Sequence, residues 1–191
     1  MAHISIIGTG NMGQVIAGLA GKGGNTVELL SSSDADKAVT GDVVVLAVPY
    51  PAVGQVIAQR GAQLAGKVVV DITNPLNFET FDSLTVPADS SAAAEIAAAL
   101  PESRVVKAFN TNFAGTLATG TAGGLPTTVL FAGDDADAKA LLAGVVGAAG
   151  LKAIDAGSLK RARELEALAF LQITLAAAEK ISWTGGFAVT N

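Results

Sequence analysis

Three glycines near the start of the chain have the spacing of a phosphate-binding turn. Gly8, Gly10 and Gly13 form the pattern G-x-G-x-x-G. In this pattern the first glycine permits a tight turn, the second lets a ligand approach the backbone, and the third lets a helix pack close to a strand. The free N–H groups of a helix N-terminus then face the phosphate charge. The sequence therefore predicts a dinucleotide whose pyrophosphate lies on Gly8, Thr9, Gly10, Asn11, Met12 and Gly13.

The elements on either side of the glycines support this prediction. The apolar run of residues 4–7 is typical of a buried parallel strand, and a helix with apolar Val15, Ile16 and Leu19 begins near Asn11. A glycine-rich turn that binds nothing is the alternative. It explains the pattern poorly, because each glycine costs a helix up to ~1 kcal/mol of stability.

Further apolar runs predict the rest of a sheet, over residues 26–30, 42–48, 67–72, 104–109, 127–133 and 151–155. Helical patterns alternate with these runs, which indicates an α/β fold with a Rossmann-type, doubly wound and mostly parallel sheet. Residues 31–41 are too few for a full crossover helix, so we expect a shortened second crossover. Residues 116–126 are rich in Gly and Thr and predict a mobile loop.

The last part of the chain has a different pattern. Residues 159–182 carry apolar side chains at spacings of three and four, which predicts one C-terminal helix. We therefore expect a dinucleotide-binding domain over residues 1–157 and a C-terminal helical segment over residues 158–191.

Composition excludes several classes of protein. Of 191 residues, 50% are hydrophobic and 15% are charged, the formal net charge is −5 and there is no cysteine. An acidic chain argues against nucleic acid, and the absence of cysteine excludes disulfides and thiolate chemistry. We expect no metal site, no membrane span, no signal peptide and a cytoplasmic location. The mean hydropathy of +0.49 hints at apolar surface buried in an oligomer.

A serine cluster follows the second predicted strand, where a dinucleotide fold meets the adenosine ribose. NAD enzymes usually place Asp or Glu there, on the 2′-hydroxyl. Here the residues are Ser31, Ser32 and Ser33, followed by Asp34. Hydroxyls can donate to a 2′-phosphate, whereas a carboxylate at the tip would repel it, and Lys37 could add positive charge. The cluster favours NADP; a plain polar loop is the alternative.

Two other predicted strand ends lie on the same carboxyl edge as the glycine turn. They are Val48-Pro49-Tyr50 and Thr73-Asn74. Ligands of open α/β sheets bind outside this edge. We expect both segments to flank the nicotinamide half of the cofactor.

Acid–base groups are scarce at this edge. The single histidine, His3, lies at the start of the first strand, and no acid, His or Lys stands at a strand end where a general base is needed. Lys107 lies within a strand and reaches the site only if its side chain points there. We therefore predict no catalytic residue, and hydride transfer between a nicotinamide and a second ring, because cofactors carry that chemistry themselves.

Several segments together resemble the NADP-dependent coenzyme F420 oxidoreductase family, over nearly the whole chain. They are Gly8-Thr-Gly-Asn-Met-Gly13, Ala47-Val-Pro-Tyr50, Ser90-Ser-Ala-Ala-Ala-Glu95, Lys107-Ala-Phe-Asn-Thr111, Gly133-Asp-Asp135 and Asp155-Ala-Gly157. The resemblance implies NADPH, a deazaflavin (F420) acceptor in a cleft beside the nicotinamide, and a nicotinamide pocket that includes Val48, Ala108 and Asn110. The family commonly has Ser-Arg where this chain has Ser31-Ser32. The acceptor could equally be a flavin, a quinone or another small molecule.

Two other functions fit part of the pattern. One is a non-catalytic NADP-sensing module that reports redox state to a partner. The other is a short β-hydroxyacid dehydrogenase, although the residues after Gly157 leave little room for the usual helical substrate domain. For an enzyme we expect a small-molecule acceptor and a homodimer whose helices help close the active-site cleft. The apolar C-terminal helix could pack on its own domain or on the partner subunit.

Overall fold

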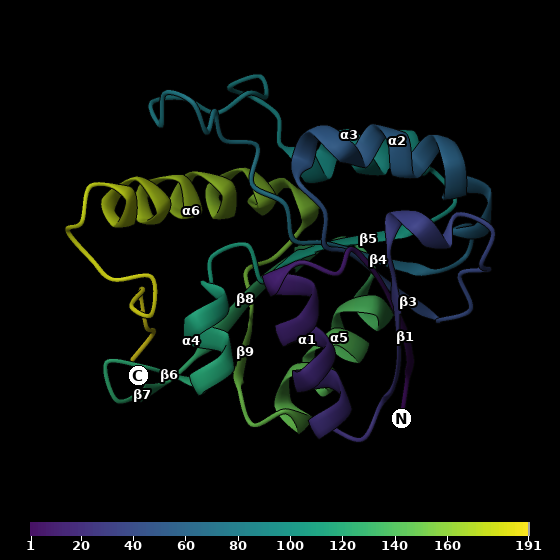
Figure 1. Ribbon diagram of the computed structural model, residues 1–191, viewed down its shortest axis with the longest axis horizontal. Coiled ribbons are helices and arrows are strands. Elements are labelled where there is room, and N and C mark those ends of the chain that lie inside the picture. Colours follow the sequence, from purple (N-terminus) through teal and green to yellow (C-terminus); the bar gives the residue numbers. More distant parts are fainter. Residues whose placement is uncertain (191) are drawn as a thin grey trace.

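The computed structural model describes residues 1–190. It contains one seven-stranded sheet with the strand order β2-β1-β3-β4-β5-β8-β9 (Figure 1). The strands are β1 His3–Ile7, β2 Thr26–Leu30, β3 Val43–Leu46, β4 Val68–Asp71, β5 Arg104–Ala108, β8 Thr128–Gly133 and β9 Lys152–Asp155. All neighbouring pairs are parallel except β5 with β8, which is antiparallel. The predicted α/β fold with a mostly parallel sheet is confirmed.

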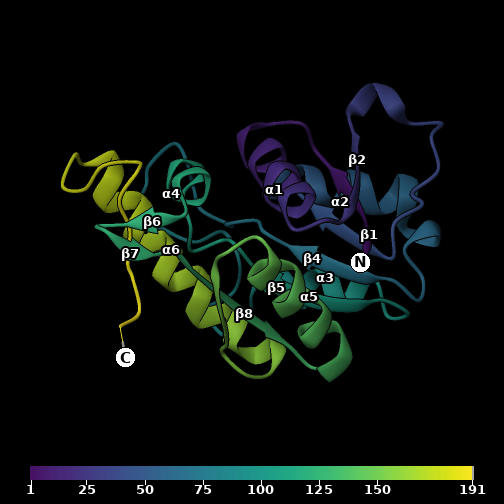
Figure 2. The same cartoon turned by 90° about the horizontal axis from the view of Figure 1, so that it is seen from below.

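Helices cover both faces of the sheet. They are α1 Asn11–Lys22, α2 Tyr50–Arg60, α3 Ala92–Ala99, α4 Ala114–Thr119, α5 Ala136–Ala148 and α6 Ala162–Ala177. Figure 1 shows α1 and α5 on one face of the sheet and α2, α3 and α6 on the other, and Figure 2 views the molecule from the side of α1 and α5. No helix within residues 1–190 combines the length and apolar character needed to cross a bilayer.

The strand pattern accounts for this layering. Successive side chains of β3 alternate between two cores: Val43 and Val45 pack beneath α1 and α5, whereas Val44 and Leu46 pack beneath α2 and α3. Because β3 is covered on both faces, every one of its side chains is buried and apolar. The continuous run of apolar residues in the sequence thus reflects a central strand.

The second crossover is shortened, as predicted. Between β2 and β3 the chain forms only a single 3₁₀ turn, η1, at Ser32–Asp34. Because no crossover helix forms here, a loop covers the end of β2, and that loop carries the serine cluster.

Two sequence predictions were wrong in detail. Residues 116–126 are not a loop: they contain the end of α4 and a small hairpin of β6 Thr121–Ala122 and β7 Leu125–Pro126. Gly120 and Gly123 allow it, because both have positive φ angles. The predicted helix over residues 159–182 begins as a 3₁₀ turn, η3 Leu159–Arg161, and α6 already ends at Ala177.

Candidate functional site

The glycine turn lies between β1 and α1, against the end of β3. Gly8 has a φ angle of +118°, and a Cβ atom on it would lie 2.1 Å from the carbonyl oxygen of Ala47. A Cβ atom on Gly13 would lie 2.1 Å from the carbonyl oxygen of Gly8. Both positions therefore require glycine: one for the turn and one for the contact between helix and turn.

Gly10 differs from the other two, because the space beside it is open. A Cβ atom there would meet nothing within 4 Å. Gly10 is the N-cap of α1, and no side chain caps that helix. The backbone N–H groups of its first turn therefore point into open space, where an anion binds well. Thr9 and Asn11 are exposed on either side of Gly10 and Met12 is half-buried, so the turn fits a pyrophosphate.

The serine cluster folds around the carboxylate of Asp34, the residue that follows it. The backbone N–H and Oγ of Ser31 both donate to Asp34, at 2.8 and 2.6 Å, and Ser31 Oγ lies 2.7 Å from Ser33 Oγ. Lys37 forms an ion pair with Asp34 at 2.7 Å. Hydrogen bonds from Lys37 and Ser31 hold the pKa of Asp34 well below its ordinary value. The hydroxyls of Ser32 and Ser33 are on the surface.

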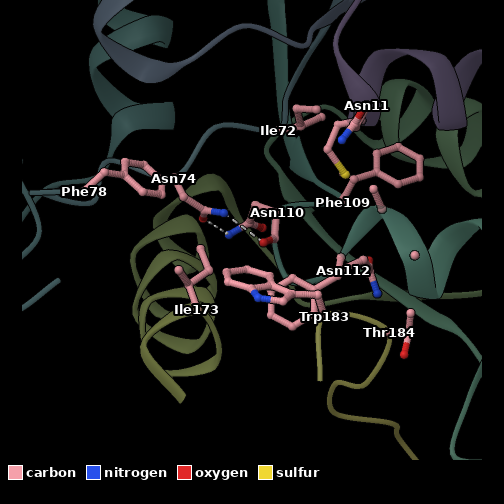
Figure 3. A pocket seen from close by; sticks show the side chains of 14 residues that line it. Asn11, Ile72, Asn74, Phe78, Phe109, Asn110, Asn112, Ile173, Trp183 and Thr184 are labelled. Carbon is pink, nitrogen blue, oxygen red and sulfur yellow. Dashed lines mark hydrogen bonds between the residues drawn. The ribbon is translucent and has the colours of Figure 1, made fainter. Parts of the chain in front are cut away.

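A cavity of about 500 Å³ opens at the carboxyl edge of the sheet, next to the N-terminus of α1. That volume is in the range of small-molecule and cofactor sites. It is lined by Asn11, Met12, Ile72, Asn74, Phe78, Phe109, Asn110, Asn112, Phe113, Ala114, Gly115, Ile173, Trp183 and Thr184 (Figure 3). The structure thus brings four residues of the predicted site into one cavity: Asn11, Met12, Asn74 and Asn110.

The other predicted residues near the nicotinamide lie outside this cavity. Val48 packs beside Gly8, and Pro49 is the N-cap of α2. Tyr50 is half-buried and donates its hydroxyl to Glu95. Thr73 is buried behind the cavity wall, and Ala108 is fully buried in the core.

Aromatic side chains form much of the cavity wall, and sequence reasoning did not identify them. Phe113 and Trp183 pack with their ring centroids 4.9 Å apart. Phe109 has a φ angle of +60°. Residues other than glycine rarely adopt this backbone conformation, and those that do are concentrated at functional sites. Thr116 Oγ1 donates to the carbonyl of Gly185 at 2.6 Å, which holds the segment after α6 against α4. The one available signal was that these aromatic residues directly follow a strand end or an apolar helix.

Asparagine amides provide the polar part of the cavity (Figure 3). Asn74 Nδ2 donates to the carbonyl of Asn110 at 3.0 Å, and Asn110 Nδ2 donates to Asn74 Oδ1 at 3.1 Å. Asn112 Nδ2 donates to the carbonyl of Thr128 at 2.9 Å. Within residues 1–190, the buried Oδ1 atoms of Asn110 and Asn112 accept no hydrogen bond. Such atoms are normally paired, and both belong to residues that line the cavity.

A buried charge cluster lies behind the cavity, and it corrects the expectation that no acid stands at a strand end. Lys107 Nζ lies 2.8 Å from Asp71 Oδ2, which ends β4, and 2.8 Å from Glu166 Oε1 on α6. It also donates to the carbonyl of Thr73 at 2.6 Å. All three side chains are at most 1% exposed. Lys107 therefore points away from the cavity and is not available to a substrate.

Glu166 links this cluster to α3. Its carboxylate accepts from the backbone N–H groups of Ala92 and Ala93, at 2.9 and 3.3 Å, and so caps the helix. Burial raises its pKa, although Lys107 opposes the shift. The cluster joins β4, β5, α3 and α6.

Several known proteins that are similar to this chain in sequence or fold are named as reductases. The family described as "NADP oxidoreductase coenzyme F420-dependent" matches residues 25–75. The F420-dependent NADP reductase of Methanocaldococcus jannaschii is 33% identical over 172 residues, which is 88% of this chain and 76% of that protein. A crystal structure from Arthrobacter sp. FB24, assigned as an F420-dependent NADP reductase, is 27% identical with a TM-score of 0.87 and covers both chains fully.

More distant structures share the fold alone. The 3-hydroxyisobutyrate dehydrogenase of Mycobacterium tuberculosis is 17% identical with a TM-score of 0.64, and the match covers 93% of this chain and 64% of that one. The M. jannaschii enzyme is similar enough, over enough of its length, to establish relationship. The chain belongs to the F420-dependent NADP reductase family and is an NAD(P)-dependent oxidoreductase.

Proposed function

We propose that this protein transfers hydride between NADP(H) and a flat heterocyclic acceptor, a deazaflavin of the F420 type or a flavin. The observation that carries the proposal is the composition of the cavity. None of the described residues that line it is Asp, Glu, His, Lys, Arg or Tyr, and Thr184 carries the one hydroxyl among them. Such a site can orient two rings and exclude water, but it offers no general acid or base. Hydride transfer between two cofactors needs only that positioning.

Each part of the site has a role in this proposal. The turn from Gly8 to Gly13 holds the pyrophosphate, and Ser31, Ser32 and Ser33 hold the 2′-phosphate. When bound, NADPH supplies a hydride from its nicotinamide ring. Val48, Pro49, Tyr50, Thr73 and Ala108 support the nicotinamide end, and Asn74 and Asn110 line it. The division of the chain at residue 157 and the cytoplasmic location stay predictions.

The cavity also favours one chemical class of acceptor. Phe109, Phe113 and Trp183 offer flat apolar surfaces, on which an aromatic ring packs well. The walls therefore favour an acceptor with a flat aromatic ring system, as flavins and deazaflavins have.

We expect the purified protein to oxidise NADPH with F420, FMN or riboflavin, and a quinone is the comparison acceptor. Absorbance of NADPH follows the reaction, with each acceptor tested under nitrogen so that oxygen does not reoxidise it. Tight NADPH binding without turnover on any acceptor would contradict the proposal and favour a sensing module. Turnover with a β-hydroxyacid and NADP would favour the dehydrogenase instead.

Trp183 reports on the acceptor, because it is the only tryptophan of the chain and lines the cavity. We expect acceptor binding to quench its fluorescence. Replacing it by Ala should raise the KM for the acceptor about three- to tenfold, since an aromatic pair contributes roughly 0.5–1.5 kcal/mol. The Kd for NADPH should stay unchanged. Trp183→Phe keeps a flat ring and is the matched control; an equal loss in both variants would speak against stacking.

The second part of the proposal is a homodimer. Leu171 on α6, Phe78 beside the cavity and Phe187 after α6 are about half exposed, although all three are large and apolar. Exposed apolar side chains on a chain with so few charges support a protein–protein contact. Sedimentation in solution tests this assembly.

A further inference from the structure

Arg60, the last residue of α2, lies beneath the loop that carries the serine cluster. Its side chain is only 4% exposed. Nη1 donates to the carbonyl of Lys37 at 2.7 Å, and Nη2 donates to the carbonyl of Asp34. Both acceptors are backbone atoms of the segment that replaces the missing crossover helix. The guanidinium therefore contacts the backbone of the segment that directly follows the serine cluster. The adenosine ribose is expected at that cluster.

The charge of Arg60 has no direct counterion. Within residues 1–190, no carboxylate lies within ion-pair distance of its guanidinium. A buried cation is normally paired, because burial without a partner is costly. Here only carbonyl dipoles compensate it. Its charge is therefore available to act on whatever binds above the loop.

The loop itself does not attract an anion. Residues 31–40 carry Asp34, Asp36 and one lysine, Lys37, so their formal charge is −1. Lys37 is already paired with Asp34. A 2′-phosphate, which carries about −1.5 to −2 at neutral pH by analogy with other phosphate monoesters, would meet net repulsion from this loop alone. With Arg60 included, the local charge rises to zero.

We infer that Arg60 determines the preference of this protein for a dinucleotide with a 2′-phosphate, acting from beneath the loop through its charge. The inference rests on the proposed function, because it requires the adenosine end of NADP to lie on Ser31–Ser33. Arg60 also holds the loop through two carbonyls, so a purely structural role must be separated from the electrostatic one. Charge acts on NADPH far more than on NADH, whereas a misplaced loop weakens both.

The experiment compares the dissociation constants of NADPH and NADH, measured by nicotinamide fluorescence, in four proteins. They are the wild type, Arg60→Gln, Arg60→Lys and Arg104→Gln. Gln removes the charge and can still donate to a carbonyl, whereas Lys keeps the charge and loses the forked geometry. Arg104 is exposed at the start of β5 and donates to the carbonyl of Gly66, so its replacement removes the same charge elsewhere.

We expect Arg60→Gln to weaken NADPH about tenfold and NADH by no more than about twofold, since one charge at this range is worth roughly a tenfold change in affinity. Arg60→Lys should lose no more than about threefold for NADPH, and Arg104→Gln should resemble the wild type. The rise of the NADPH dissociation constant with salt should also be shallower in Arg60→Gln. Thermal unfolding of each variant shows whether it is folded.

Three results would overturn the inference: equal weakening of both dinucleotides in Arg60→Gln, equal losses in the Lys and Gln variants, or an unchanged preference. If Arg60→Gln does not fold, the test uses Arg60→Lys and the wild type instead. The dissociation constant of NADPH must then rise with salt more steeply than that of NADH, and an equal rise overturns the inference. A wild type that binds neither dinucleotide contradicts the proposed function itself, whereas a wild type that prefers NADPH while Arg60→Gln keeps that preference contradicts only the role of Arg60.

Discussion

Replacing Lys107 by Met is expected to lower the free energy of unfolding by about 3–5 kcal/mol, which is the usual cost of removing one partner from a buried ion cluster. The substitution leaves Asp71 and Glu166 buried at 2.8 Å from the missing ammonium, with no cation to neutralise them. Equilibrium unfolding in urea measures the effect. Lys180→Met is the matched control: Lys180 is exposed, and its loss should change stability by less than about 0.5 kcal/mol.

A second substitution identifies the source of that cost. Glu166→Gln removes one of the two stranded carboxylates and retains an oxygen that can accept from Ala92 and Ala93. In the Lys107→Met background, Glu166→Gln should restore more than about 1 kcal/mol of the free energy of unfolding, because residues in one network are strongly coupled. Strict additivity of the two substitutions would show that the cluster does not act as a unit.

Replacing Gly13 by Ala should abolish useful dinucleotide binding, with a loss in NADPH affinity of at least about a hundredfold, or ~2.7 kcal/mol. The new Cβ would lie 2.1 Å from the carbonyl oxygen of Gly8, so α1 must move away from the turn. That shift also costs stability, by about 1–3 kcal/mol. Fluorescence titration with NADPH and unfolding in urea measure the two effects on the same protein.

Two other glycines of this region separate binding from stability. A Cβ on Gly10 meets nothing in the protein, so Gly10→Ala should fold normally and still weaken NADPH, because the methyl occupies the approach to the pyrophosphate. Gly18 is an exposed helix position with equally open space, and Gly18→Ala should stabilise the protein by up to ~1 kcal/mol and leave binding unchanged. Normal NADPH binding by Gly10→Ala would place the pyrophosphate elsewhere.

Local signals explain what the sequence predicted correctly. The turn at Gly8 and Gly13 depends on contacts with residues close in the chain or on the adjacent strand end. The run Val43–Leu46 is apolar on both faces because helices cover both faces. The short second crossover could be predicted from chain length alone, since the segment between β2 and β3, which forms η1, is too short for a crossover helix. These features need no knowledge of distant parts of the chain.

The missed features all depend on residues far apart in the sequence. The ring contact of Phe113 with Trp183 joins residues seventy positions apart, and a sequence pattern does not show which segment returns to the cavity. Lys107 looked like a candidate for the site because nothing local revealed its pairing with Glu166 on α6. The serine cluster was identified, but the fold of its turn, which brings Asp34 back onto Ser31, depends on Arg60 beneath it.

The position of Trp183 and Glu166 late in the chain has a consequence for biosynthesis. The glycine turn and most of the sheet emerge from the ribosome well before α6 does, so the pyrophosphate site precedes the far wall of the cavity. Until α6 arrives, the N-terminus of α3 lacks its cap from Glu166. A nascent chain stalled before residue 162 therefore has a cofactor turn without a closed acceptor site. Ribosome-bound intermediates of this protein should engage a dinucleotide before they can engage an acceptor.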